Sequence, residues 1–442
     1  MGKIREDIEE NIEAEQEGYD TGEDALSAEL RAKIEWFRDQ KIGVIFHWGL
    51  YAQAGIVESW QLSEEDEWAR EPHSWRPSLD ALRKDYWALN QTFKPSRFDA
   101  RKWAETCKAA GFRYMIFTTK HHDGFSMYDT QFSDYKLSGG DSAFRDDPRA
   151  DAFGEAAREF QAAGLAVGAY YSKADWHSPY YWVPGQHAKG RTASYDPQER
   201  PDLWTKFNQF VTDQLTELAT NYGKLDLLWL DAGWVNGGNH EFLDMDTIAG
   251  KVRKKQPDLL IVDRTIGGKY ENYVTPERKI PETAPVKAWE SNIPLANNWG
   301  YVPGDSYKSF GQILESIVKI VCMGGNVILG VGPKPDGTLP EEAVTLMAAL
   351  GDWLDRYGEA VYSTRPIHFE DLSNHFAFVQ NGEIIYGFIK TEELTAALLT
   401  ELSAQTETVT FLNSGQTVNL REAQTDLPTY NELYTVFKFK RA

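Results

Sequence analysis

The sequence predicts an α/β fold: a (β/α)8-like, TIM-type barrel followed by a small C-terminal antiparallel β-sandwich. Three observations lead to this prediction. Short apolar runs alternate with amphipathic stretches along most of the chain, no glycine-rich nucleotide-binding loop follows any of these runs, and the pattern changes near residue 366. We expect an acidic N-terminal lead-in over residues 1–30, the barrel over residues 31–362 and the β-sandwich over residues 363–442.

Seven apolar runs are typical of buried parallel strands, because a strand that is covered on both faces is apolar along its whole length. An eighth strand is irregular or absent in this interpretation. A doubly wound open sheet is the alternative architecture, but its usual nucleotide-binding loop is missing. The seven runs are IGVIFHWG (42–49), YMIFTTKHHDGF (114–125), AVGAYYS (166–172), LDLLWLDAGW (225–234), LLIVDRT (259–265), VKAWES (286–291) and NVILGVGP (326–333).

The segments between these runs predict helices. One begins near Phe98, one covers about residues 202–223 and one covers about residues 310–325. The second has apolar residues at spacings of three and four along one face, which is the pattern of a helix packed on a core. After about residue 366, short segments rich in β-branched and aromatic residues alternate with polar turns, which favours a small antiparallel β domain.

The composition excludes several classes of partner. The 442 residues carry a formal net charge of −21, which repels phosphate groups, so we expect neither nucleic acid nor a membrane as a partner. The N-terminus lacks the apolar segment of a signal peptide, and no apolar run approaches the ~18 residues of a membrane span. We expect a soluble protein, cytoplasmic or, if a leader has been removed, periplasmic or secreted. Assembly into a homo-oligomer stays open.

Polar side chains follow the apolar runs where the predicted strands end. Any one of them alone is usually structural, because caps and turns recruit the same residue types. In a parallel barrel, however, the C-terminal ends of the strands meet at one rim, where the active site is built. We therefore expect one site that contains His47, His121, His122, Tyr171, Asp231, Arg264 and Glu290.

The residue types at this rim favour glycoside hydrolysis. Three histidines and an acid could bind a metal, but the first strand offers only His47, and the sequence has no H-E-x-x-H motif or cysteine cluster. A G-x-S-x-G motif for serine hydrolysis is also missing. Carboxylates surrounded by His, Arg, Trp and Tyr are the groups that glycosidases use. We expect no metal and no cofactor, and an Asp231 that Arg264 keeps ionised.

Five blocks between about residues 34 and 360 resemble, in order, the α-L-fucosidases of glycoside hydrolase family 29. They are WFRDQKIGVIFHWGLY, FTTKHHDGF, LLWLDAGW, KAWES with NNWGY, and GGNVILGVGPKPDGTLP. The resemblance implies an exo-acting retaining hydrolase that removes terminal α-L-fucosides through a covalent glycosyl–enzyme intermediate. Its substrate would be a fucosylated oligosaccharide or glycoconjugate, and a C-terminal β-sandwich is the family's usual arrangement.

The resemblance also assigns roles to matching residues. Asp231 would be the nucleophile, with Arg264 beside it, and Tyr171 would be a further sugar contact. The three histidines, His47, His121 and His122, would hydrogen-bond fucose hydroxyls. Trp229 and Trp299 would line an apolar pocket for the C6 methyl group.

The general acid/base and one loop are less clearly matched. Glu277 is the favoured acid/base and Glu290 the alternative, because the context of this residue varies within the family. In the loop after the first strand, Glu58 and Trp60 are the expected sugar contacts, with Glu67 and Trp68 as the alternative pair. Gly330 stands where the family usually has Asn.

Two other functions would use the same scaffold. One is a catalytically inactive carbohydrate-binding protein, which the presence of Asp231 and candidate acids disfavours. The other is a metal-dependent barrel hydrolase that uses the three histidines and Asp231. The linkage and the leaving group are not encoded in any motif of the sequence.

Overall fold

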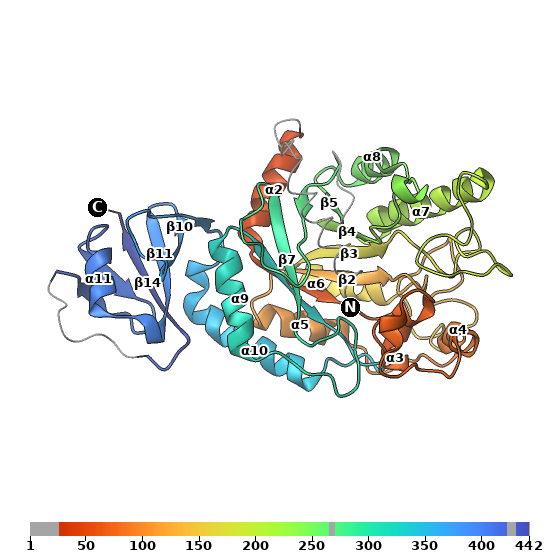
Figure 1. The fold of residues 1–442 in the computed structure, drawn as a ribbon, viewed down its shortest axis with the longest axis horizontal. Coiled ribbons are helices and arrows are strands. Elements are labelled where there is room, and N and C mark those ends of the chain that lie inside the picture. The colour runs from red at the N-terminus through yellow and green to blue at the C-terminus, as the bar shows by residue number, and fades with distance from the viewer. Residues whose placement is uncertain (1–25, 265–269, 422–429, 442) are drawn as a thin grey trace.

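The computed structural model describes residues 26–264, 270–421 and 430–441, so most of the expected acidic lead-in lies outside the described residues. Eight parallel strands form a nearly closed barrel in the order β5-β4-β3-β2-β1-β8-β7-β6 (Figure 1). Its strands are β1 (Ile42–Phe46), β2 (Tyr114–Lys120), β3 (Ala166–Ser172), β4 (Leu227–Asp231), β5 (Leu260–Asp263), β6 (Tyr273–Val274), β7 (Ala288–Pro294) and β8 (Asn326–Val331).

The seven predicted strands are confirmed, and the eighth is the two-residue β6, which pairs with β7. Between β5 and β6, Asn272 supplies hydrogen bonds to β5 that a longer β6 strand would otherwise make. Its backbone N–H donates to the Ile261 carbonyl at 2.8 Å, and its side-chain oxygen accepts from the Ile261 N–H at 2.8 Å. A strand of two residues is too short to produce an apolar run in the sequence, so β6 was not predicted.

Helices alternate with the strands and cover the outside of the barrel (Figure 1). The three predicted helices are confirmed as α5, α7 and α9. The Asp99 side chain caps α5 by accepting from the Lys102 N–H at 3.0 Å, and Pro201 occupies the first turn of α7, where its missing N–H costs nothing. The helices up to the end of the barrel are α2 (Ala28–Gln40), α3 (Leu50–Ala54), α4 (Leu79–Trp87), α5 (Ala100–Ala109), α6 (Ala152–Ala162), α7 (Pro201–Asn221), α8 (Met245–Lys255), α9 (Phe310–Cys322) and α10 (Glu341–Tyr357).

Strand β4 shows how its side chains divide between the two faces of the barrel wall. Leu227 and Trp229 pack in the cluster inside the barrel, whereas Leu228 and Leu230 pack in the cluster between barrel and helices. This alternation directs every second residue inward. Asp231, which pairs in register with Ser172, therefore ends the strand on the inner side of the rim.

The C-terminal residues form a six-stranded antiparallel sheet in the order β13-β12-β14-β11-β10-β9, which confirms the predicted antiparallel β unit. Its edge next to the barrel contacts α9 (Figure 1). Its elements are β9 (Arg365–Pro366), β10 (Ala377–Asn381), β11 (Ile384–Lys390), α11 (Ala396–Leu402), β12 (Thr408–Phe411), β13 (Thr417–Asn419) and β14 (Tyr434–Lys440). Within the residues that the structure describes, no helix combines the length and apolarity needed to cross a bilayer.

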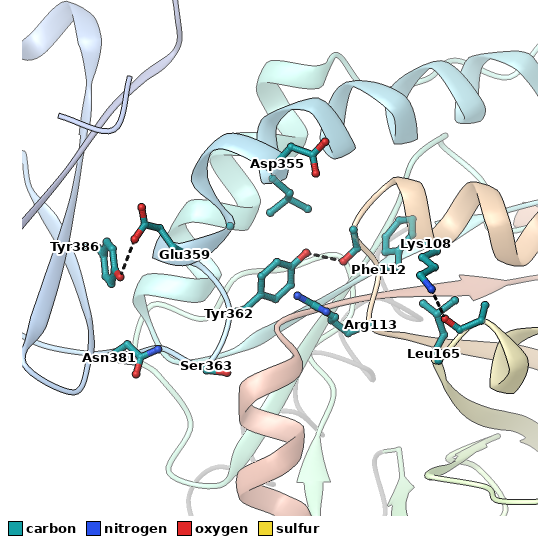
Figure 2. A pocket seen from close by; sticks show the side chains of 15 residues that line it. Lys108, Phe112, Arg113, Leu165, Asp355, Glu359, Tyr362, Ser363, Asn381 and Tyr386 are labelled. Carbon is teal, nitrogen blue, oxygen red and sulfur yellow. Dashed lines mark hydrogen bonds between the residues drawn. The ribbon is translucent and has the colours of Figure 1, made fainter. Parts of the chain in front are cut away.

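A cavity of about 630 Å³ lies where the barrel meets this sheet (Figure 2). Arg113 and Leu165, which precede β2 and β3, line it from the barrel, and Tyr386 of β11 lines it from the sheet. The Tyr362 hydroxyl closes part of the junction by donating to the Gly111 carbonyl at 2.5 Å. The cavity is therefore at the N-terminal ends of the strands, at the opposite end of the barrel from Asp231.

Candidate active site

Asp231 lies at the C-terminal end of β4 with three polar groups around its carboxylate. The Tyr170 hydroxyl donates to Oδ2 at 2.5 Å, Arg264 Nη1 lies 3.5 Å from Oδ1, and His122 Nε2 lies 3.8 Å from Oδ2. Burial alone would raise the pKa of Asp231, but the Arg264 charge and the tyrosine hydrogen bond outweigh it and hold the pKa well below its usual value. Asp231 is therefore ionised, as the sequence predicts.

Arg264 joins Asp231 to a second carboxylate, Glu277. Its Nη2 forms an ion pair with Glu277 Oε2, while the Trp299 indole N–H donates to Glu277 Oε1 at 3.0 Å. Burial works to raise the pKa of Glu277, and the Arg264 and Arg278 charges overcome it, so the pKa is lowered. Since a single guanidinium contacts both carboxylates, the two acids lie close together at the rim.

Glu290, the alternative acid, lies elsewhere. The sequence predicts that its strand ends near residue 291, but β7 runs on to Pro294, so Glu290 is inside the barrel rather than at the rim. It pairs with Asn326, the first residue of β8, and accepts a hydrogen bond from Tyr114, the first residue of β2. Burial raises the pKa of Glu290 to about 7. This residue is thus a buried acid near the N-terminal ends of the strands.

The two neighbouring tyrosines of β3 point in opposite directions. Tyr170 faces inward to Asp231 and stacks on Trp229, with ring centroids 5.3 Å apart. Tyr171 faces the helices, donates to Gln214 Oε1 of α7 at 2.8 Å and accepts from Lys120 at 3.1 Å. The structure therefore does not bring the predicted Tyr171 to the site, and places Tyr170 there instead.

The three predicted histidines gather beside these carboxylates. His47 follows β1 and stacks on Trp299 at 5.1 Å, while the His121 and His122 rings follow β2 and lie 4.1 Å apart. Burial lowers the pKa of His121 to about 4, and it lowers the pKa values of His47 and His122 well below the usual value. All three rings are therefore neutral at pH 7.

Hydrogen bonds assign the tautomer of His122. The Ser172 hydroxyl donates its single hydrogen to the Ala174 carbonyl at 2.8 Å, so at its 2.7 Å contact with His122 Nδ1 it must accept. The proton of the neutral ring is then on Nδ1, and Nε2 carries a lone pair. This Nε2 is buried, has no partner within the described residues and faces Asp231. It can accept a hydrogen bond from a ligand hydroxyl.

The loop after β1 places Glu58 and Trp60 close to the histidines and Trp299 of the candidate site. Glu58 has a left-handed φ of 37° and accepts from the Gly300 N–H at 2.6 Å, and burial raises its pKa to about 7. The Trp60 ring lies 4.8 Å from the His122 ring. Of the alternative pair, Glu67 is exposed, and the Trp68 indole donates to Asp66 at 2.9 Å.

Gly330 explains how Trp299 reaches its position. A Cβ atom at residue 330 would lie 2.6 Å from Trp299 Cε3, closer than two carbons can approach. The Trp299 ring thus fills the space that an Asn side chain would need. The absence of a side chain at Gly330 lets Trp299 contact both His47 and Glu277.

Three residues of the site escaped sequence reasoning: Tyr170, Ser59 and Ser172. Ser59 Oγ lies 2.6 Å from His121 Nδ1, and Ser172 makes the equivalent contact with His122. Ser59 stands between the predicted Glu58 and Trp60, so the loop was identified but not this contact. Choosing Tyr170 over Tyr171 requires the register between β3 and β4, which a single sequence does not give.

Two carboxylates on one arginine, neutral histidines and aromatic rings at the C-terminal rim of a barrel define a class of protein, the glycoside hydrolases with a (β/α)8-type fold. Residues 8–359 match the sequence model of the family described as Alpha-L-fucosidase. The chain belongs to the alpha-L-fucosidase family, which confirms the predicted enzyme class and does not favour the inactive binding protein or the metal-dependent hydrolase.

The chain is also similar to curated relatives and to solved structures. The tissue alpha-L-fucosidase of Bos taurus is 24% identical over 405 residues, which cover 87% of this chain and 81% of the relative. The solved alpha-L-fucosidase isoenzyme 1 of Paenibacillus thiaminolyticus is 26% identical with a TM-score of 0.76, over 94% of this chain and 100% of that chain. The alpha-fucosidase of Thermotoga maritima is 24% identical with a TM-score of 0.68, over 91% and 96% of the two chains.

Proposed function

We propose that this protein is an exo-acting, retaining α-L-fucosidase that hydrolyses terminal α-L-fucosides of oligosaccharides or glycoconjugates. The observation that carries the proposal is the contact of Asp231 and Glu277 with the same Arg264 side chain. Retaining glycosidases need two carboxyl groups close together, one to attack the sugar and one to protonate the leaving group, whereas inverting enzymes need a wider gap for water.

In the first step, an Asp231 oxygen forms a bond to the anomeric carbon while the bond to the leaving oxygen breaks. Glu277 gives its proton to that oxygen. In the second step, Glu277 takes a proton from water, the water oxygen bonds to the anomeric carbon, and the Asp231 carboxylate is released. The low pKa of Asp231 suits this role, because only the carboxylate attacks.

Glu277 is the better candidate for the acid/base. It lies at the rim with 17% of its side chain exposed, whereas Glu290 is fully buried and bonded to Tyr114. In the free protein Arg264 favours the ionised form of Glu277. A substrate that covers Glu277 removes its remaining contact with water, which raises the pKa toward the value that a proton donor needs.

The remaining groups would hold the sugar. His122 Nε2 accepts from one hydroxyl, and His47, His121, Glu58 and Trp60 border the same space. The C6 methyl group would meet the partly exposed Trp299 ring, which packs against the buried cluster that contains Trp229 and the missed Tyr170.

The test is the Asp231→Gly variant with an aryl α-L-fucoside and no added metal. The turnover number should fall about 10⁴-fold while the fold survives, because the attacking group is gone. Azide should then restore turnover and give β-L-fucosyl azide, the inverted product, because azide occupies the place of the carboxylate. Substantial turnover of Asp231→Gly without azide would refute the assignment, as would loss of wild-type activity with a chelator.

A further inference from the structure

Arg278, the residue after Glu277, has an unusual backbone. Its φ is 54°, a left-handed value that side-chain-bearing residues seldom adopt and that concentrates at functional sites. Its N–H donates to the Asn292 carbonyl at 3.0 Å, which fixes the segment against β7. The left-handed φ and this hydrogen bond together fix the backbone at Arg278.

The guanidinium group of Arg278 is held in place yet open to solvent. Its Cζ lies 5.2 Å from the centre of the Trp299 ring, and Nη1 donates to the Asn297 carbonyl at 2.8 Å. Nε lies 3.9 Å from Glu277 Oε1, and 37% of the side chain is exposed. Since a guanidinium has five N–H donors, this anchoring leaves donors for a ligand.

Arg264, the other arginine beside Glu277, differs from Arg278 in its exposure and in the groups that it contacts. Its side chain is only 11% exposed, and its Nη1 and Nη2 point at Asp231 and Glu277. Arg264 thus faces the two carboxylates, whereas Arg278 is the more exposed arginine beside Glu277. A leaving group whose oxygen Glu277 protonates would lie within reach of a side chain in this position.

We propose that Arg278 binds the leaving group and that this leaving group is a saccharide, whose hydroxyl oxygens accept hydrogen bonds from the guanidinium. The proposal rests on the proposed function, in which Glu277 protonates the leaving oxygen. The contacts with the Trp299 ring and the Asn297 carbonyl hold the guanidinium before the substrate arrives, which reduces the entropy lost on binding. Arg278 thereby favours fucose attached to a sugar over fucose attached to a small alcohol.

The experiment compares two substrates that make the same demand on the acid: an α-L-fucosyl disaccharide and methyl α-L-fucoside. Both release a poorly acidic alcohol, but only the disaccharide carries hydroxyls that reach Arg278. In Arg278→Ala the ratio of kcat/KM for disaccharide over methyl fucoside should fall about 10-fold or more, the effect of losing a charged hydrogen bond. The control variant is Lys279→Ala, which removes the next, exposed cation and should leave the ratio unchanged.

An unchanged ratio in Arg278→Ala overturns the proposal, because a purely structural arginine would slow both substrates equally. An equal fall of the ratio in Lys279→Ala also overturns it, since general charge would then explain the effect. If the wild-type protein releases fucose from neither substrate and from no aryl fucoside, the proposed function itself has failed, which is a distinguishable result.

Discussion

The two ends of the barrel hold glutamates in contrasting surroundings. At the C-terminal rim, Glu277 keeps contact with solvent and pairs with Arg264, so its pKa is lowered. Inside, near the N-terminal ends, Glu290 is bonded to a tyrosine hydroxyl, and burial raises its pKa to about 7. The same residue type is thus ionised at one end and only about half ionised near pH 7 at the other. The partner of each glutamate, rather than the sequence motif around it, therefore decides the direction in which its pKa shifts.

The largest expected effect separates these two glutamates. Glu277→Ala should reduce kcat/KM for a disaccharide about 10²–10⁴-fold, and much less for an aryl fucoside with a good leaving group, because only the poor leaving group needs protonation. Added azide should give α-L-fucosyl azide, the retained product, from the fucosyl–enzyme intermediate. Glu290→Gln serves as the control and should show neither property. If Glu290→Gln shows both and Glu277→Ala neither, the assignment is reversed.

A smaller effect on activity is expected from Gly330→Ala, which tests whether Gly330 makes room for the Trp299 ring. The added methyl group would displace Trp299 from Glu277 and cost about 1–3 kcal/mol of stability by overpacking, with a loss of kcat/KM. Stability is measured by thermal or denaturant unfolding and activity by initial rates. In a Trp299→Ala background the same substitution should have a smaller effect, which comes from the 3.1 Å approach of the new Cβ atom to Pro294 Cα. An equal loss in both backgrounds would show that Gly330 acts independently of Trp299.

The smallest effect on activity belongs to Glu290→Gln, which instead changes how stability depends on pH. The folded pKa of about 7 lies above the usual 4.5, so the folded state binds more protons and the stability supplied by this group is lost as pH rises from about 4.5 through 7. Because Gln does not titrate, the free energy of unfolding of Glu290→Gln should decline less over this pH range, by roughly 3 kcal/mol at 1.36 kcal/mol per pKa unit. Urea unfolding at pH 4.5, 6 and 7.5 measures it. A decline as steep as in the wild type would contradict a raised pKa for Glu290.

Much of the fold was predictable because buried parallel strands and their helices leave long periodic signals. The strand that escaped, β6, has only two residues, and the side chain of Asn272 replaces its missing pairing with β5. No local pattern encodes such a replacement. It becomes visible only when the partner strand is in place.

The candidate site was predictable where a polar residue directly follows an apolar run, as for Asp231 and the histidines. A site residue was not predictable where its position depends on which residues of a strand face inward or on where the strand ends. Tyr170 and Tyr171 differ by one residue and face opposite sides of the wall, and Glu290 looked like a strand end because the polar Ser291 and Asn292 follow it inside β7. Both cases need the register with a neighbouring strand.

The tautomer of His122 leaves two acceptors opposite each other across 3.8 Å, its Nε2 lone pair and a carboxylate oxygen of Asp231. Neither can satisfy the other, so whatever enters this gap must bring its own hydrogen. A ligand that lacks a hydroxyl at that point leaves a buried acceptor without a donor, a penalty far larger than the loss of one ordinary contact. Under the proposed function, selectivity at this position would come mainly from weaker binding of an analogue that lacks this hydroxyl.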